Sequence, residues 1–195
     1  MEGYLGAIRT RDTAGPRGGQ GTIEADGLRL RPFTRADIEW VYEVSLDSAL
    51  QRFVRLPSPY HRRDAAFFVD QVALAGWDGG RRAEFVAEDP ATERPLARVG
   101  LGLHPNGAAE IGFWTDPAAR GHGVATTAVG AVCGWAFRTL GLGVVEWRSE
   151  VGNEAARRVA EKAGFQVEAT LRRRLVRRGE RVDVWVGSLL PEDVA

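Results

Sequence analysis

The chain has 195 residues, of which 44% are hydrophobic and 27% are charged, a composition typical of one globular domain with a sizeable core. Its 26 basic and 26 acidic residues give a formal net charge of zero, so no overall field would attract nucleic acid or an anionic membrane surface. Cys133 is the only cysteine, which excludes an internal disulfide and favours a buried packing role. No apolar run approaches the roughly 18 residues that span a bilayer, and the N-terminus lacks a signal pattern, so we expect a cytoplasmic protein.

The first 25 residues differ in character from the rest of the chain. The stretch from Thr13 to Gly21 is rich in glycine and lacks apolar periodicity. Such a segment cannot bury enough apolar surface to offset its ordering entropy. We therefore expect a flexible extension over residues 1–25 and a domain over residues 28–190.

The domain opens with a strand and two helices. Alternation from Leu28 to Arg31 predicts a strand, and Thr34 is a suitable cap for a helix that runs to Val44. A second helix is expected over 64–77, where Gly79 and Gly80 stop it. Its apolar face is expected to consist of Ala65, Phe68, Val72 and Ala75.

The remaining elements alternate between strands and helices. Turn-forming residues at 89–90 and 105–107 separate three strands, which indicates an antiparallel meander over 83–88, 97–103 and 109–115. Helices are expected over 124–140 and 154–163. Further strands are expected over 144–150, 167–175 and 181–189. This order predicts the α+β class with a mixed sheet.

A glycine-rich turn between the strand ending at Thr115 and the helix starting at Val124 carries the chemistry of the chain. The first amides of a helix lack intrahelical acceptors and sit at the positive end of its dipole, so they can hold a phosphate. Gly121 and Gly123 would let that phosphate approach the backbone. The dinucleotide pattern needs a third glycine where Thr126 stands, and the nucleotide-triphosphate loop needs a Gly-Lys-Ser or Gly-Lys-Thr that the chain lacks.

Two spaced motifs resemble those of GNAT acetyltransferases. The run from Arg120 to Ala125 matches the Arg/Gln-x-x-Gly-x-Gly/Ala pyrophosphate loop of that superfamily, and the run from Asn153 to Phe165 resembles its second signature, in which an asparagine opens a helix that ends in Gly-Phe. The stretch 110–117 and the hairpin 172–190 look most like the RimJ/RimL-type branch. That branch acetylates the N-termini of ribosomal proteins and other amines.

The resemblance implies a fold, a cofactor and a set of binding residues. The fold would be a GNAT fold, with about four helices and a single mixed, mostly antiparallel sheet in which a central strand pair splays apart. The donor would be acetyl-CoA, with no metal. Asn153 is equally a good helix N-cap in any protein. The residues expected to bind acetyl-CoA are Phe113, Trp114, Thr115, Arg120, Gly121, His122, Gly123, Val124, Ala125, Thr126 and Asn153.

The resemblance also implies direct attack of an amine on the thioester, without a covalent enzyme intermediate. Glu110 is the first candidate for a general base because strand alternation puts it on one face with Gly112 and Trp114; the alternative is a solvated carboxylate at a strand start. His104 is a second candidate, since histidine changes protonation near neutral pH, although its place beside a turn also fits a plain turn residue. Ala160 stands where many members carry a tyrosine that protonates the leaving thiolate.

The predicted function is N-acetyl transfer to a primary amine, either a protein N-terminus or a small molecule. One alternative is transfer of a larger acyl group such as succinyl, and another is a catalytically silent acyl-CoA-binding module. A basic cluster at 172–174 and 177–178 would either attract an acidic substrate or solvate a hairpin. The expected partner is therefore the amine substrate, with no nucleic acid and no membrane. At the family level, the protein is expected to be a monomer or a homodimer.

Overall fold

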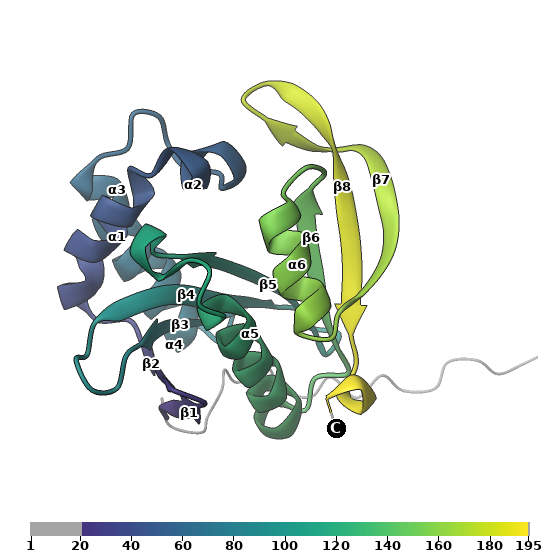
Figure 1. The fold of residues 1–195 in the computed structure, drawn as a ribbon, viewed down its shortest axis with the longest axis horizontal. Coiled ribbons are helices and arrows are strands. Elements are labelled where there is room, and N and C mark those ends of the chain that lie inside the picture. Colours follow the sequence, from purple (N-terminus) through teal and green to yellow (C-terminus); the bar gives the residue numbers. More distant parts are fainter. Residues whose placement is uncertain (1–20, 195) are drawn as a thin grey trace, which may run out of the picture.

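An eight-stranded sheet organises residues 21–194, the part of the chain that the computed structural model describes (Figure 1). Its spatial order is β1-β2-β3-β4-β5-β6-β8-β7, and every neighbouring pair is antiparallel except β5 and β6. The predicted α+β class with a single mixed, mostly antiparallel sheet is confirmed. The strands are β1 (Ile23–Ala25), β2 (Leu28–Pro32), β3 (Arg82–Glu88), β4 (Pro95–Leu103), β5 (Ala108–Thr115), β6 (Val144–Glu150), β7 (Gln166–Arg177) and β8 (Glu180–Leu189).

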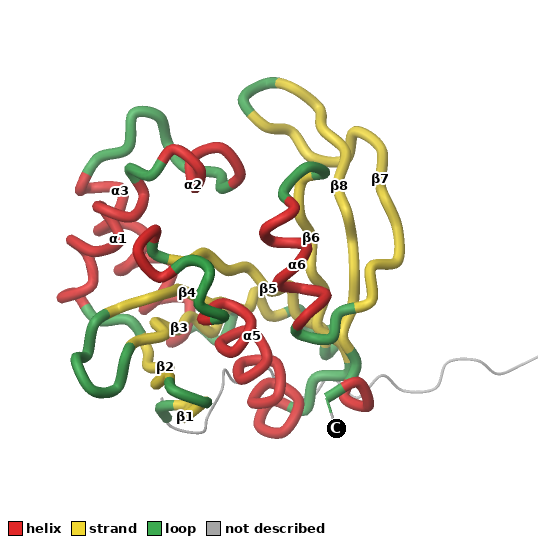
Figure 2. Tube along the Cα trace, viewed as in Figure 1, coloured by secondary structure: helices red, strands yellow, loops and turns green. Residues whose placement is uncertain are grey.

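One set of helices gathers at one end of the sheet, at the left of Figure 1, and in the tube view their coils stand apart from the later helices (Figure 2). Their side chains form a core around Val41, Val69 and Val86, which Phe33 and Tyr60 complete. The helices of this set are η1 (Arg35–Asp37), α1 (Ile38–Ser45), α2 (Ser48–Phe53), α3 (Arg62–Phe67), the π-helical η2 (Phe68–Leu74) and α4 (Ala75–Asp78). The members that supply this core, α1, α3 and η2, cover the sheet face that carries Val86, whereas Trp77 of α4 packs in the other core against Phe85.

The opposite face is covered by α5 (Val124–Trp135), the π-helical η4 (Ala136–Leu140) and α6 (Glu154–Lys162). Two short 3-10 helices, η3 (Pro117–Ala119) and η5 (Pro191–Asp193), are the remaining helical elements of the described residues. Val99, Ile111 and Val129 belong to the larger core on this face. Cys133 is fully buried there, which confirms its packing role, and burial raises the pKa of its thiol to about 12. Such a thiol stays protonated and is a poor nucleophile.

The central strands β5 and β6 separate after a short paired segment. Ala108–Ile111 pairs with Val144–Trp147, while β5 continues to Thr115 along β4 and β6 continues to Glu150 along β8. The sheet therefore divides into two halves, and Figure 1 shows β6, β8 and β7 turned away from the first five strands. The expected splayed strand pair is confirmed.

The structure corrects several expected boundaries. Ile23–Ala25 lies within the segment expected to be flexible but forms a strand on β2, while residues 1–20 lie outside the described part of the chain. The second helix starts at Arg62 and contains a π-helical turn. Its buried face is therefore not the predicted one of Ala65, Phe68, Val72 and Ala75; the buried apolar residues are Ala65, Val69, Ala73 and Trp77.

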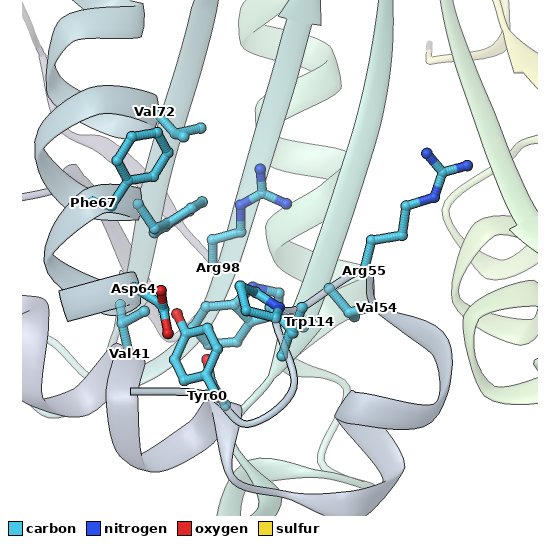
Figure 3. A pocket seen from close by; sticks show the side chains of 13 residues that line it. Val41, Val54, Arg55, Tyr60, Asp64, Phe67, Val72, Arg98 and Trp114 are labelled. Carbon is cyan, nitrogen blue, oxygen red and sulfur yellow. The ribbon is translucent and has the colours of Figure 1, made fainter. Parts of the chain in front are cut away.

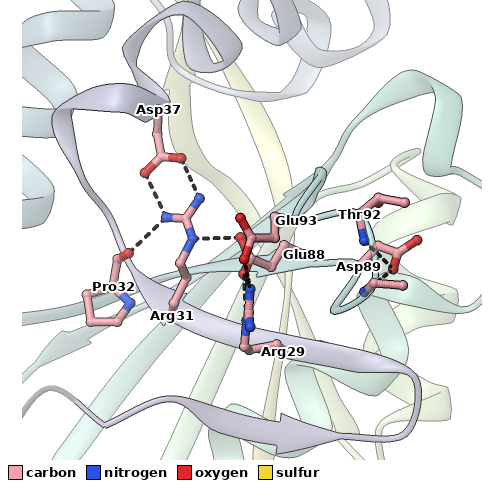
Figure 4. Close-up of polar contacts among 9 residues, drawn as sticks. Arg29, Arg31, Pro32, Asp37, Glu88, Asp89, Thr92 and Glu93 are labelled. Carbon is pink, nitrogen blue, oxygen red and sulfur yellow. Dashed lines mark hydrogen bonds and ion pairs between the residues drawn. The ribbon is translucent and has the colours of Figure 1, made fainter.

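A buried carboxylate joins the first two long strands and the entry to α1 (Figure 4). Glu88, 1% exposed, accepts from Nε of Arg29 at 2.7 Å and from Nε of Arg31 at 2.6 Å. Arg31 also pairs with Asp37 through Nη2 and Oδ1 at 2.7 Å, and this hydrogen bond is the main cause of the raised pKa of Arg31. The network fixes the angle at which the chain leaves β2 for the helices.

Within residues 21–194, no helix combines the length and the apolar character needed to cross a lipid bilayer.

Candidate active site

The gap between β5 and β6 exposes a free strand edge. The amide of Asp116 donates to the carbonyl of Leu96 on β4, and backbone groups of successive residues point to alternate sides of a strand. The N–H and C=O groups of Phe113 and Thr115 therefore point away from β4, into the gap. The backbone of Trp114 faces β4, where it stands opposite Arg98. Phe113 and Thr115 can accordingly pair with an extended ligand.

The glycine-rich turn at the end of this gap presents a row of unpaired amides. Gly121 and Gly123 both have a φ of 82°, and a Cβ on either would meet no atom within 4 Å. These positions need glycine for their backbone conformation and not for close packing. The first intrahelical bond of α5 runs from Thr127 to Gly123, so among the described residues no amide from 121 to 126 has an acceptor. This arrangement can bind a phosphate.

Two contacts fasten the turn to the helices on the other side of the sheet. Asp116 accepts from the Ala118 amide at 2.9 Å through Oδ1 and from Nε1 of Trp40 at 3.1 Å through Oδ2. Arg120 donates from Nη2 to Oδ1 of Asp47 at 2.6 Å, and this hydrogen bond is the main cause of the lowered pKa of Asp47. The side chain of Arg120, expected to bind the cofactor, thus anchors the loop.

The remaining expected binding residues lie in different surroundings. Asn153 caps α6, because its Oδ1 accepts the Ala156 amide at 3.3 Å, and its Nδ2 has no partner within residues 21–194. The exposed His122 lies with Val124 and Thr127 at a cavity of about 270 Å³ near the turn between β1 and β2. Nowhere in the described chain do three or more His, Cys, Asp or Glu side chains form a metal-binding group.

On the opposite side of the gap lies an apolar cavity of about 310 Å³ (Figure 3). We call it the acceptor pocket. Burial is the main cause of the raised pKa of Tyr60 in its wall, so that phenol stays protonated at neutral pH. The pocket is lined by Val41, Ser45, Val54, Arg55, Leu56, Pro57, Tyr60, Asp64, Phe67, Phe68, Val72, Arg98 and Trp114.

A buried ion pair lies in the floor of this pocket. Arg98 donates to both oxygens of Glu84, from Nε at 2.7 Å and from Nη2 at 2.7 Å. Arg98 is 8% exposed and Glu84 1% exposed. A Cβ on Gly100 would collide with Oε2 of Glu84, so that glycine makes room for the pair. None of these three residues stands out in the sequence.

The two candidate bases lie in different places. Glu110 shares a sheet face with Gly112 and Trp114, as expected. Its side chain is 46% exposed, and its Oε2 lies 3.5 Å from Nε of Arg148. Two residues of strand, about 7 Å, separate it from Gly112, where the gap begins. His104 lies in the exposed turn between β4 and β5, four residues or about 14 Å along β4 from Gly100, which stands opposite Gly112. Glu110 is therefore the nearer of the two candidates to the gap.

The chain is similar to known proteins over most of its length. A family model described as acetyltransferase (GNAT) domain matches residues 27–166. The uncharacterized N-acetyltransferase YoaA of Bacillus subtilis (strain 168) is 26% identical over 170 residues, which cover 86% of this chain and 96% of that protein.

Two solved structures share the fold. RimL, a ribosomal L7/L12 alpha-N-protein acetyltransferase in complex with coenzyme A, has a TM-score of 0.81 at 19% identity, over 90% of this chain and 100% of that one. A spermidine N-acetyltransferase from Vibrio cholerae, in complex with CoA and spermine, has a TM-score of 0.73 at 20% identity, over 86% of this chain and 98% of that one.

Proposed function

Since the chain belongs to the GNAT acetyltransferase family and is therefore an acyltransferase, we propose that it binds acetyl-CoA between β5 and β6 and transfers the acetyl group to a primary amine. The observation that carries this proposal is the continuous path from the unpaired amides of 121–126, along the free edge at Phe113 and Thr115, to Gly112 and the acceptor pocket. A phosphate, an amide-bearing arm and a reactive thioester follow one another in the same order in acetyl-CoA.

Each part of this path would hold one part of acetyl-CoA. The pyrophosphate would accept hydrogen bonds from the amides that follow Arg120, at the positive end of α5. The pantetheine amides would pair with the backbone of Phe113 and Thr115, and the free Nδ2 of Asn153 faces no competing partner in the described chain. Trp114 would contribute its side chain to the acceptor pocket, because its backbone is engaged with β4.

The proposed reaction is direct attack in a ternary complex. The amine nitrogen bonds to the thioester carbon, the C–S bond then breaks, the amine loses a proton and the coenzyme A thiolate takes one up.

At pH 7 a lysine amine is neutral in about one molecule in 2,500 and an α-amine in about one in seven, so a base matters more for lysine-like acceptors. Glu110 is the proposed base, and His104 stays the second candidate, farther along the strand from the gap. Ala160 is fully buried and supplies no acid, so water would protonate the thiolate.

The acceptor is proposed to be a protein N-terminus or a small amine. A pocket of about 310 Å³ suits a few residues of extended peptide or a small molecule. Transfer of a larger acyl group such as succinyl, and acyl-CoA binding without turnover, remain the competing proposals. A monomer or homodimer in the cytoplasm stays the prediction for the protein's state and location.

Thermal unfolding of the purified protein tests the cofactor. At a hundredfold excess over its dissociation constant, a ligand adds about 2.7 kcal/mol, which raises the melting temperature of a chain of this size by about 5 to 10 °C. We expect this increase with acetyl-CoA and with coenzyme A but not with NADH. Release of free thiol in the presence of a panel of amines then distinguishes an enzyme from a silent binding module. No shift at millimolar acetyl-CoA would contradict the proposal.

A further inference from the structure

The guanidinium of Arg98 is held by hydrogen bonds along one edge, while its other edge has no hydrogen-bond partner in the described chain. Its Nε and Nη2 both bind Glu84, while Nη1 has no acceptor in the part of the chain that the structure describes. An arginine has five N–H groups, two of them on Nη1. Nη1 therefore keeps both of its N–H donors without a protein partner, on an arginine that is only 8% exposed.

The free edge lies where the reacting groups are proposed to meet. Nη1 would be 3.2 Å from a Cβ on Gly112, the first residue of β5 beyond its pairing with β6. Arg98 also lines the acceptor pocket, and in Figure 3 its side chain stands between Phe67 on one side and Arg55 on the other. The two donors thus stand beside both the gap and the pocket.

The charges around this edge favour an anion. Glu84 is shared with Arg82, whose Nε donates to it at 2.8 Å, so two guanidinium groups surround one buried carboxylate. Arg55 is a second cation in the pocket wall and has no ion-pair partner within residues 21–194. Asp64 also lines the pocket, but its Oδ2 caps α3 by accepting the His61 amide at 2.8 Å. An incoming carboxylate would therefore meet the guanidinium groups of Arg98 and Arg55, and one acid, Asp64, of which one oxygen already accepts a hydrogen bond.

We propose that Arg98 forms a carboxylate-binding subsite of the acceptor pocket, with Glu84 holding its guanidinium in place. This inference rests on the proposed function and specifies its substrates: one of the two reactants carries a carboxylate near the reacting centre. The carboxylate belongs either to the amine acceptor or to the far end of the acyl chain. In both cases it takes charge-assisted hydrogen bonds from Nη1.

The donor arm of the test uses calorimetric titration of butyryl-CoA and succinyl-CoA, which have acyl chains of equal carbon number and differ in charge. If the acyl group supplies the carboxylate, succinyl-CoA binds about 10- to 100-fold more tightly than butyryl-CoA.

The acceptor arm uses acetyl-CoA and matched amines: peptide amides that begin Ala-Glu or Ala-Gln, and 4-aminobutyrate or its amide. If the acceptor supplies the carboxylate, kcat/KM favours the acid of at least one pair by the same factor.

The variants separate the subsite from a structural role. Arg98→Gln alone would leave Glu84 buried with fewer partners, so the test variant is the double change Glu84→Gln with Arg98→Gln, which removes both buried charges. Its acid-to-amide or succinyl-to-butyryl ratio should fall to near one. The matched control is Arg82→Gln, which removes a guanidinium from the same carboxylate outside the pocket and should keep the ratio.

Two kinds of failure are distinguishable. A wild-type protein that does not bind acetyl-CoA refutes the proposed function itself. A protein that binds acetyl-CoA but shows no carboxylate preference in either arm, or whose preference survives in the double variant, overturns the subsite and leaves the acetyltransferase proposal standing.

Discussion

Gly123 lies at the junction of the glycine-rich turn and α5, where its backbone has a φ of 82°. Alanine in this conformation costs about 1 to 2 kcal/mol, so Gly123→Ala should lower the free energy of unfolding by that amount. It should also weaken acetyl-CoA binding, because a relaxed turn no longer aligns the amides of 121–126. Urea unfolding and calorimetric titration measure the two effects.

Gly130 provides the control for this prediction. It lies within α5, with open space where a Cβ would stand. Gly130→Ala should therefore stabilise the protein by about 0.5 to 1 kcal/mol and leave acetyl-CoA affinity alone. Equal effects of the two alanine variants on stability and on affinity would argue against a special role for the turn.

Single residues differed in how far the sequence could identify them. Gly121 and Gly123 stand out because glycine before a helix has a local meaning, and Asn153 caps its helix as its residue type suggests. The pairing of Glu84 with Arg98 has no local signal. It depends on the register of β3 on β4, which places Gly100 opposite Glu84 and leaves room for the guanidinium.

Among elements, length decided what the sequence could predict. The strands from β3 onward and the helices α5 and α6 repeat their apolar pattern often enough to fix their type and nearly their ends. The three residues of β1 and the six of α2 are too short to show a period. The π-helical turn of η2 shifts the buried face of its helix, and no residue pattern distinguishes that turn from an α-helix.

The junction of β2, β3 and η1 depends on one buried acid. Glu88→Gln should cost about 1 to 3 kcal/mol, since it leaves Arg29 and Arg31 without their shared carboxylate while keeping the side-chain shape. Glu93→Gln is a matched control, because Glu93 is 76% exposed and also pairs with Arg29. Surface pairs contribute little, so it should change stability by less than about 1 kcal/mol. Comparable losses from the two glutamine variants, measured by urea unfolding, would contradict the assignment.

At the scale of the whole molecule, the glycine-rich turn and the acceptor pocket share their supports. Trp40 on α1 binds Asp116 at the start of the turn, and Asp47 at the start of α2 binds Arg120 within it. The far end of α2 meets the β7–β8 hairpin, where Nη2 of Arg178 donates to the Gln51 carbonyl at 3.4 Å. Segments from three parts of the chain thus frame one site, and Arg178 is the member of the basic cluster that contacts α2.

Asp47 allows this connection to be tested through its dependence on pH. Asp47→Asn keeps a good helix cap for α2 but removes the charge opposite Arg120. The pKa of Asp47 is lowered in the folded protein, chiefly by the hydrogen bond from Arg120. Its ionised form therefore stabilises the fold at pH values above its unfolded pKa of about 3.9, and this contribution is lost as the pH falls through the lower folded value.

The wild-type protein should accordingly exceed Asp47→Asn in the free energy of unfolding by up to about 1 kcal/mol near pH 7, since the pair is partly exposed. The difference should shrink below pH 4, as urea unfolding at pH 7, 5, 4 and 3 would reveal. Asp78→Asn serves as the control, because Asp78 lies exposed at the end of α4 and has no ion-pair partner among residues 21–194. A difference for Asp47→Asn that stays constant or grows toward acid would mean that Arg120 does not hold the turn through this carboxylate.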